Sequence, residues 1–121
     1  MWLMTKHGFY SIVEKRPGEF HIRSREAADL RNLIERVPLP GGRVVDTPNA
    51  DYRARIVADR PTVQTVMRFL ADSVDYSNFK DTVDRTPDQC HKPYHGVWDV
   101  LAEALGAYGR PGKRKSPRAG E

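Results

Sequence analysis

The sequence predicts an α+β fold: a four-stranded, mainly antiparallel sheet with two helices on one face. Three observations support this prediction. Segments of β-branched and aromatic residues alternate with segments whose apolar residues recur every three to four positions. Two pairs of predicted strands are each followed by a helix, in the order ββαββα. Ferredoxin-like folds and their permuted relatives are the nearest common architecture. An extra C-terminal helix is expected to close the core.

The first predicted hairpin uses residues 9–14 and 20–23. The first run is aromatic and β-branched, and the second alternates apolar and polar side chains, which is typical of a half-buried strand. Residues 16–18 contain the Pro-Gly pair expected of a turn. Residues 2–5 are compatible with a further short strand, which the count of four leaves out. Ser24 is a suitable N-cap for a helix whose apolar stripe is formed by Ala27, Leu30, Leu33, Ile34 and Val37.

The second half of the pattern repeats this order. Residues 43–45 read as a short strand, and residues 52–58 alternate again. Asp59 is expected to cap the following helix, with Pro61 in its first turn, where a missing N–H does no harm. The apolar stripe of this helix is formed by Val63, Val66, Met67, Leu70 and Val74.

The C-terminal part is expected to add two helices to the same domain. Ser77 is a candidate cap for a short helix, and Pro93 is expected to open a longer one. The inward-facing residues of the longer helix would be Tyr94, Val97, Trp98, Leu101 and Leu105. We therefore predict a single domain over residues 1–109, followed by a disordered basic tail over residues 110–121.

The net charge of +4 is unevenly distributed. Residues 1–109 contain 15 basic and 15 acidic residues, so the excess belongs to the tail. Within the domain, residues 1–60 carry +3 and residues 61–109 carry −3. The single cysteine, Cys90, excludes a disulfide framework. With neither a signal peptide nor an apolar run of membrane-spanning length, we expect a cytoplasmic protein that does not contact membranes.

Three motifs indicate a resemblance to known sequences. They are Met1-Trp2-x-x-Thr5-Lys6-x-Gly8-Phe9-Tyr10-Ser11-x-Val13, Asp51-Tyr52-x-x-Arg55-Ile56 and Asp75-Tyr76-x-Asn78-Phe79-Lys80. In these motifs the chain resembles a group of short, uncharacterised bacterial proteins. The resemblance covers most of residues 1–108. It implies one compact domain and carries no functional residues across.

A basic sheet face is the first candidate site. If Phe20 and Ile22 point to the core, their neighbours along the strand point away, and the same alternation applies to residues 52–58. The residues expected on this face are His21, Arg23, Arg25, Arg53 and Arg55. Tyr10 would add a stacking surface if Phe9 and Val13 pointed inward. Guanidinium groups beside an aromatic ring suit phosphate contact and base stacking. The alternative is a solvated face whose arginines pair with nearby carboxylates.

The basic tail is the second candidate. Lys113, Arg114 and Lys115 could neutralise phosphates without any fixed structure. The alternative is a solubilising end that has no partner.

Other constellations point to function more weakly. Metal-compatible groups occur at Asp88, Cys90, His91, His95 and Asp99. Pro93 separates the two histidines, so we expect neither a metal site nor a cofactor. A small nuclease could draw on Asp46, Asp51, Asp75, His21 and Tyr52, but no spacing selects them. The aromatic and polar residues over 75–80 form either a recognition surface or a structural corner.

The leading hypothesis is a non-catalytic binding module for an acidic partner, most simply nucleic acid. Two alternatives stay open. One is an adaptor domain that binds another protein or a second copy of itself, because the two halves carry opposite charge. The other is a small nuclease of the toxin or host–phage conflict type.

Overall fold

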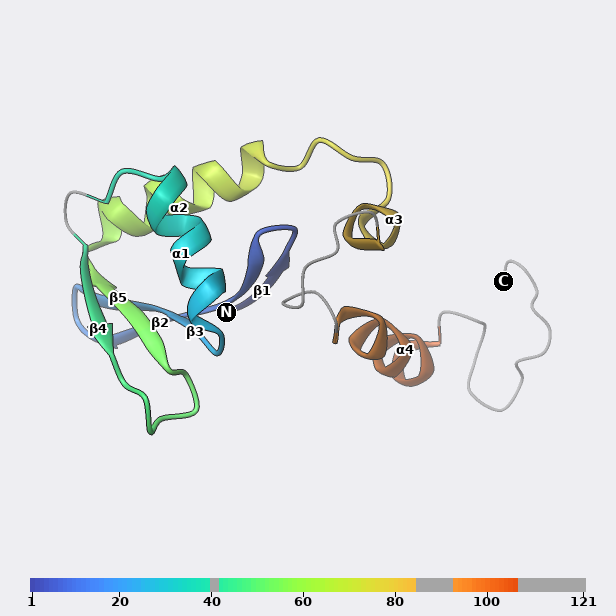
Figure 1. Ribbon diagram of the computed structural model, residues 1–121, viewed down its shortest axis with the longest axis horizontal. Coiled ribbons are helices and arrows are strands. Elements are labelled where there is room, and N and C mark those ends of the chain that lie inside the picture. The colour runs from blue at the N-terminus through green and yellow to red at the C-terminus, as the bar shows by residue number, and fades with distance from the viewer. Residues whose placement is uncertain (40–41, 85–92, 107–121) are drawn as a thin grey trace. The chain divides into compact units, whose positions relative to one another are not determined.

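The computed structural model describes residues 1–39, 42–84 and 93–106 (Figure 1). The chain divides into two compact units, residues 1–90 and residues 91–121, and each is described by itself. The prediction of one domain over residues 1–109 therefore stays a prediction.

The first unit contains a five-stranded sheet in which every neighbouring pair is antiparallel. The strands are β1 (Trp2–Thr5), β2 (Gly8–Arg16), β3 (Glu19–Ser24), β4 (Arg43–Asp46) and β5 (Ala54–Ala58). Their spatial order is β1-β2-β3-β5-β4. The predicted count of four was wrong, because residues 2–5 pair with β2 and form an edge strand. β4, with its charged ends Arg43 and Asp46, forms the other edge.

The connection from β3 to β4 is a crossover. Both strands pair antiparallel with β5, which lies between them, so β3 and β4 run in the same direction. The intervening helix α1 (Ala27–Arg36) contacts β2, β3 and β5. Helix α2 (Arg60–Asp72) follows β5 and contacts β3. Both helices pack on the same face of the sheet and share its core (Figure 1).

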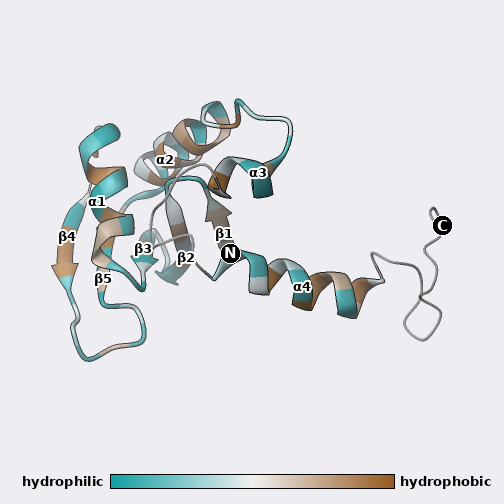
Figure 2. Ribbon diagram, turned by 45° about the vertical axis from the view of Figure 1, so that its right-hand side comes forward, coloured by the Kyte–Doolittle hydropathy of each residue, from teal (hydrophilic) through white to brown (hydrophobic). Residues whose placement is uncertain are grey.

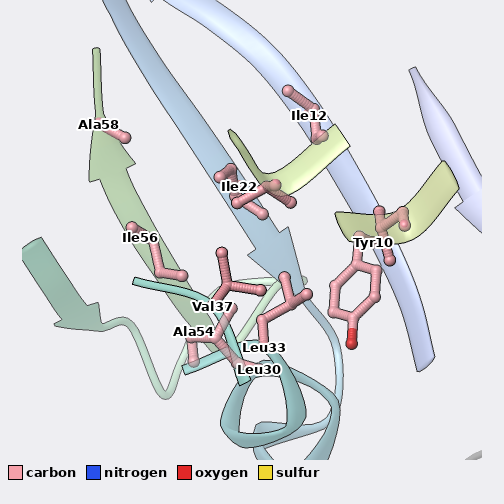
Figure 3. Packing of buried hydrophobic residues seen from close by; sticks show 11 residues of the cluster. Tyr10, Ile12, Ile22, Leu30, Leu33, Val37, Ala54, Ile56 and Ala58 are labelled. Atoms are coloured by element: carbon pink, nitrogen blue, oxygen red, sulfur yellow. The ribbon is translucent and has the colours of Figure 1, made fainter. Parts of the chain in front are cut away.

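The core lies between this sheet face and the two helices. Figure 3 shows Leu30, Leu33 and Val37 pointing from α1 toward the sheet. The predicted alternation is confirmed here, since Ile22 and Ile56 are fully buried on neighbouring strands. The full cluster consists of Tyr10, Ile12, Ile22, Leu30, Leu33, Val37, Ala54, Ile56, Ala58, Val66 and Leu70.

The turn between β1 and β2 is fastened to the start of α1 by Asp29. The Oδ2 atom of this buried carboxylate accepts a hydrogen bond of 2.9 Å from the Phe9 amide. The Tyr10 hydroxyl donates to the Asp29 carbonyl at 2.7 Å. Within the turn, the Thr5 hydroxyl donates to the Gly8 carbonyl at 2.8 Å. The first sequence motif therefore has a structural role, which is to anchor an edge hairpin to a helix.

Two predicted caps and one strand boundary were wrong. Ser24 ends β3, and α1 begins after Glu26, whose side chain makes no capping bond. The Ser24 hydroxyl instead donates to the Glu26 carbonyl. In the short helix α3 (Phe79–Asp84), Asn78 rather than Ser77 accepts a hydrogen bond from the amide of Asp81. Strand β5 begins at Ala54, two residues later than predicted.

The second unit contains α4 (Tyr94–Leu105). It ends at Gly106, whose left-handed φ of 77° stops the helix. Apolar residues recur along α4 (Figure 2), and Val97, Leu101 and Leu105 are exposed rather than inward-facing. No helix in the described part of the chain combines the length and the apolar character needed to cross a membrane.

Asp59 caps α2 as predicted, and it makes the stability of the first turn of α2 depend on pH. Its Oδ1 accepts a hydrogen bond of 3.0 Å from the Thr62 amide. Hydrogen bonds from Thr62 hold the pKa of Asp59 below its usual value. The bond from the Thr62 side chain has the larger effect, and the bond from its backbone amide has the smaller one. A lowered pKa means that the folded state favours the charged form. The charged Asp59 therefore adds to the free energy of unfolding. This stabilisation is fully present above the unfolded-state pKa of about 3.9 and is lost as the pH falls through the folded-state pKa.

We therefore expect Asp59→Ala to lower the free energy of unfolding at pH 7 and to lose this deficit in acid. Urea unfolding at neutral pH and in acid measures both effects. Asp59→Asn is the matched control, because an asparagine caps equally well and does not titrate. A deficit of Asp59→Ala that stays constant with pH would contradict the assigned role of the charge.

Candidate functional site

The sheet face turned away from α1 and α2 carries a row of side chains from all five strands. The pairing registers align the row in the order Trp2, Ser11, Arg23, Arg55 and Val45. His21 lies in the next row, opposite Val13 and Val57. We call the group Trp2, Ser11, His21, Arg23 and Arg55 the arginine face.

Arg23 is held between a hydroxyl group and an aromatic ring. One terminal nitrogen donates to the Ser11 hydroxyl at 2.8 Å, and Ser11 is fully buried. The guanidinium carbon lies 4.4 Å from the centre of the Tyr52 ring, and that of Arg25 lies 4.7 Å from the same centre. Such cation–π contacts position a guanidinium group without neutralising it. The Nε atom of Arg23 is buried without a hydrogen-bond partner.

Arg55 is held by His21. One terminal nitrogen of Arg55 lies 3.0 Å from Nδ1 of His21. Because a guanidinium group only donates, Nδ1 accepts, and the proton of the neutral ring is on Nε2. That nitrogen faces the Glu19 carboxylate at 2.8 Å. The hydrogen bond from His21 holds the pKa of Glu19 below its usual range. Like Arg23, Arg55 has a buried Nε atom with no partner.

In the described part of the chain, the guanidinium groups of the arginine face form no ion pairs. No carboxylate there lies within salt-bridge distance of Arg23, Arg25 or Arg55. The ion pairs closest to the face use Glu19, which contacts His21 and Arg16. The contacts therefore do not favour the alternative of a solvated face whose arginines pair with nearby carboxylates. Arg23 and Arg55 are held by a hydroxyl group, an aromatic ring and an imidazole ring rather than by carboxylates.

The structure brings together four of the sequence-predicted site residues: His21, Arg23, Arg25 and Arg55. Arg53 was expected on this face from strand alternation, but it precedes β5 and is exposed in a loop. Lys113, Arg114 and Lys115 lie outside the described residues. The suggestion that Tyr10 adds a stacking surface was wrong. Tyr10 is fully buried on the helix side, because the strand alternation puts Phe9, Ser11 and Val13 on the other face.

Sequence reasoning missed three residues of the site. Trp2 was read as part of an uncounted strand, Ser11 had no assigned role, and Tyr52 was placed toward the core. Tyr52 is buried, but the two groups over its ring are Arg23 and Arg25. The motif Asp51-Tyr52-x-x-Arg55 contained a usable signal, because it places an aromatic residue just before a strand that carries an outward arginine.

The other predicted constellations form no site within the residues that the structure describes. No group of three or more metal-ligating side chains is close enough to hold an ion in the described ranges, and Asp88, Cys90 and His91 lie outside them. A polar hollow of about 360 Å³ is lined by Asp75, Tyr76, Ser77, Asn78, Asp81 and Thr82. The side chains of Asp75, Asn78 and Thr82 have partners within the protein. Asp75 contacts Lys6 at 2.9 Å, and this hydrogen bond lowers the pKa of Asp75. Asn78 caps α3.

Comparisons with protein-family models, with curated proteins and with solved structures found no match to this chain.

Proposed function

We propose that the protein is a non-catalytic binding module for nucleic acid and that the arginine face contacts the phosphates. The observation that carries this proposal is that Arg23 and Arg55 lie side by side on β3 and β5, and that no carboxylate of the described residues is within salt-bridge distance of either. An anionic ligand at this face would supply the missing counter-charge.

The placement of these arginines favours an extended polyanion over a single small anion. A guanidinium group presents its donors in a planar fork that matches two oxygens of a phosphate. Arg23 and Arg55 are direct neighbours across β3 and β5, so they present two such forks side by side. Repeated phosphates at a regular spacing would use both forks at once, whereas a single small anion would not. The basic residues of the tail would add contacts that need no fixed structure.

The strand order is consistent with this role. We propose that β2-β3-β5-β4 is a ferredoxin-like sheet in which the final strand has moved to the start of the chain. The split β3-α1-β4 crossover, with β5 in between, supports this arrangement. Four-stranded sheets of this kind, with helices on one face, leave the other face free to bind RNA.

The test is a salt titration of binding to single-stranded and duplex RNA and DNA. We expect binding at low salt that weakens as salt rises. The double variant Arg23→Ala/Arg55→Ala should bind more weakly, and the slope of log K against log salt should fall by about 0.7 for each lost phosphate contact on a single strand. Fluorescence anisotropy of labelled oligonucleotides measures both quantities.

The matched control is Arg31→Ala/Arg68→Ala. This double variant removes the same charge from exposed positions on α1 and α2. If it lowers the affinity and the slope as much as the arginine-face variant, binding follows net charge alone and the proposed face is wrong. Absence of binding to all four nucleic acids at low salt would reject the proposed function.

A further inference from the structure

Trp2 is the most exposed aromatic side chain on the arginine face, with 74% of its surface accessible. Exposing a large aromatic surface to water is unfavourable, because such side chains contribute most when they are buried. Its backbone is nevertheless fixed. Trp2 pairs with Ser11, and next to it the Ile12 amide donates to the Met1 carbonyl at 2.9 Å. The indole ring therefore stands on an ordered edge strand.

The neighbours of Trp2 form a small aromatic platform. Its ring centre lies 6.3 Å from that of Phe9, and the two rings are tilted by 60°. Phe9 and Trp2 project from the same sheet face, since Trp2 pairs with Ser11 two residues along β2. Such an edge-to-face contact orients the indole ring, and most of its surface remains free for a planar ligand.

The position of Trp2 relative to the arginines is set by the sheet. Trp2, Ser11, Arg23 and Arg55 are aligned across four successive strands. Neighbouring strands are about 4.8 Å apart, so Arg23 lies about 10 Å and Arg55 about 14 Å from Trp2 along the row. Ser11 lies between Trp2 and Arg23 in the row, and its hydroxyl accepts the hydrogen bond that holds Arg23.

From this arrangement we infer that Trp2 stacks against an unpaired base and that the ligand of the arginine face is single-stranded nucleic acid. The inference rests on the proposed function and adds the ligand class and the base-contacting residue. A duplex keeps its bases stacked inside, so its flat base surfaces are not accessible to an exposed ring. A single strand can place one base on Trp2 while its phosphates reach Arg23 and Arg55.

The test uses the full chain carrying Trp98→Phe, which leaves Trp2 as the only tryptophan. The probes are an oligothymidylate, an oligouridylate and an abasic oligomer of the same length, which has the phosphates but no bases. We expect both base-bearing oligomers to quench the fluorescence of Trp2 and the abasic oligomer to leave it unchanged. The affinity for the base-bearing oligomers should exceed that for the abasic one by about tenfold, as expected for one stacked base.

Variants at Trp2 complete the test. Trp2→Ala should lower the affinity for the oligothymidylate to that for the abasic oligomer, and Trp2→Phe should retain most of the difference. Val44→Ala is the matched control, since Val44 is 52% exposed and lies on the opposite face of the sheet. Circular dichroism verifies that each variant is folded.

The outcomes separate the two proposals. Equal affinity for base-bearing and abasic oligomers, with no quenching, would overturn the stacking role of Trp2 and leave the phosphate-binding face intact. Tighter binding of duplex than of single strands would likewise overturn it. Failure to bind any of these polyanions would reject the proposed function and this inference with it.

Discussion

Gly8→Ala is expected to lower the free energy of unfolding by about 3 kcal/mol or more, which is a large part of the stability of a small domain. Gly8 has a φ of 148°, which side-chain-bearing residues rarely adopt. A Cβ atom here would lie 2.4 Å from Cγ of Asp29, so the buried carboxylate would have to move. That movement would break the hydrogen bond to the Phe9 amide and disturb the carbonyl that binds Tyr10. Urea unfolding monitored by circular dichroism measures the loss.

Gly18→Ala is the matched control for this variant. Gly18 also has a positive φ, at 79°, but an added Cβ atom would have no neighbour within 4 Å. Its substitution should cost about 1 kcal/mol, from the left-handed backbone alone. Equal losses for the two variants would contradict the steric role assigned to Asp29.

Leu33→Ala is expected to destabilise the protein by about 3 kcal/mol, because the side chain is 0% exposed and its removal leaves a cavity. Leu33 projects from the middle of α1 toward the sheet, beside Val37 and Leu30 (Figure 3). The cavity would open in the helix–sheet interface, where the packing of α1 against β2, β3 and β5 limits relaxation. Denaturant unfolding with an unchanged m-value would show that stability alone has changed.

Ile34→Ala provides the internal comparison for Leu33→Ala. The two residues are adjacent and similar in size, but Ile34 is 39% exposed. We expect its substitution to cost about 1 kcal/mol or less, since the removed surface is already partly in water. A similar loss at both positions would mean that α1 is rotated differently on the sheet than described.

The apolar stripe of α1 shows how far sequence patterns predict this fold. Periodicity located the helix and correctly assigned Leu30, Leu33 and Val37 to its inner side. It also assigned Ile34 to the inner side. Leu33 and Ile34 lie three and four residues after Leu30, and both spacings satisfy a 3.6-residue period. The rotation of the helix about its axis depends on contacts with strands distant in the sequence. Val74 was assigned to the stripe of α2 for a different reason, because the helix ends at Asp72, before the periodicity does, and leaves Val74 exposed.

The candidate site was predicted only where strand alternation continues unbroken. His21 and Arg23 follow directly from the buried positions of Phe20 and Ile22, and Arg55 follows from Ala54 and Ile56. The contribution of Trp2 depends on a pairing register between β1 and β2, which local composition does not determine. The contribution of Tyr52 depends on where β5 begins, and strand boundaries are set by tertiary hydrogen bonds such as that from the Thr47 amide to the Arg53 carbonyl.

The short edge strand β4 has a consequence for the chain in a crowded solution. An unpaired strand edge is a template on which other chains can add, and here the two central residues are both valines. Arg43 and Asp46 put a charge at each end of this four-residue strand, so an incoming strand would have to bury or displace both. The brevity of β4 and its flanking charges therefore act as protection against aggregation at an edge of the sheet that has no partner strand among the strands that the structure describes.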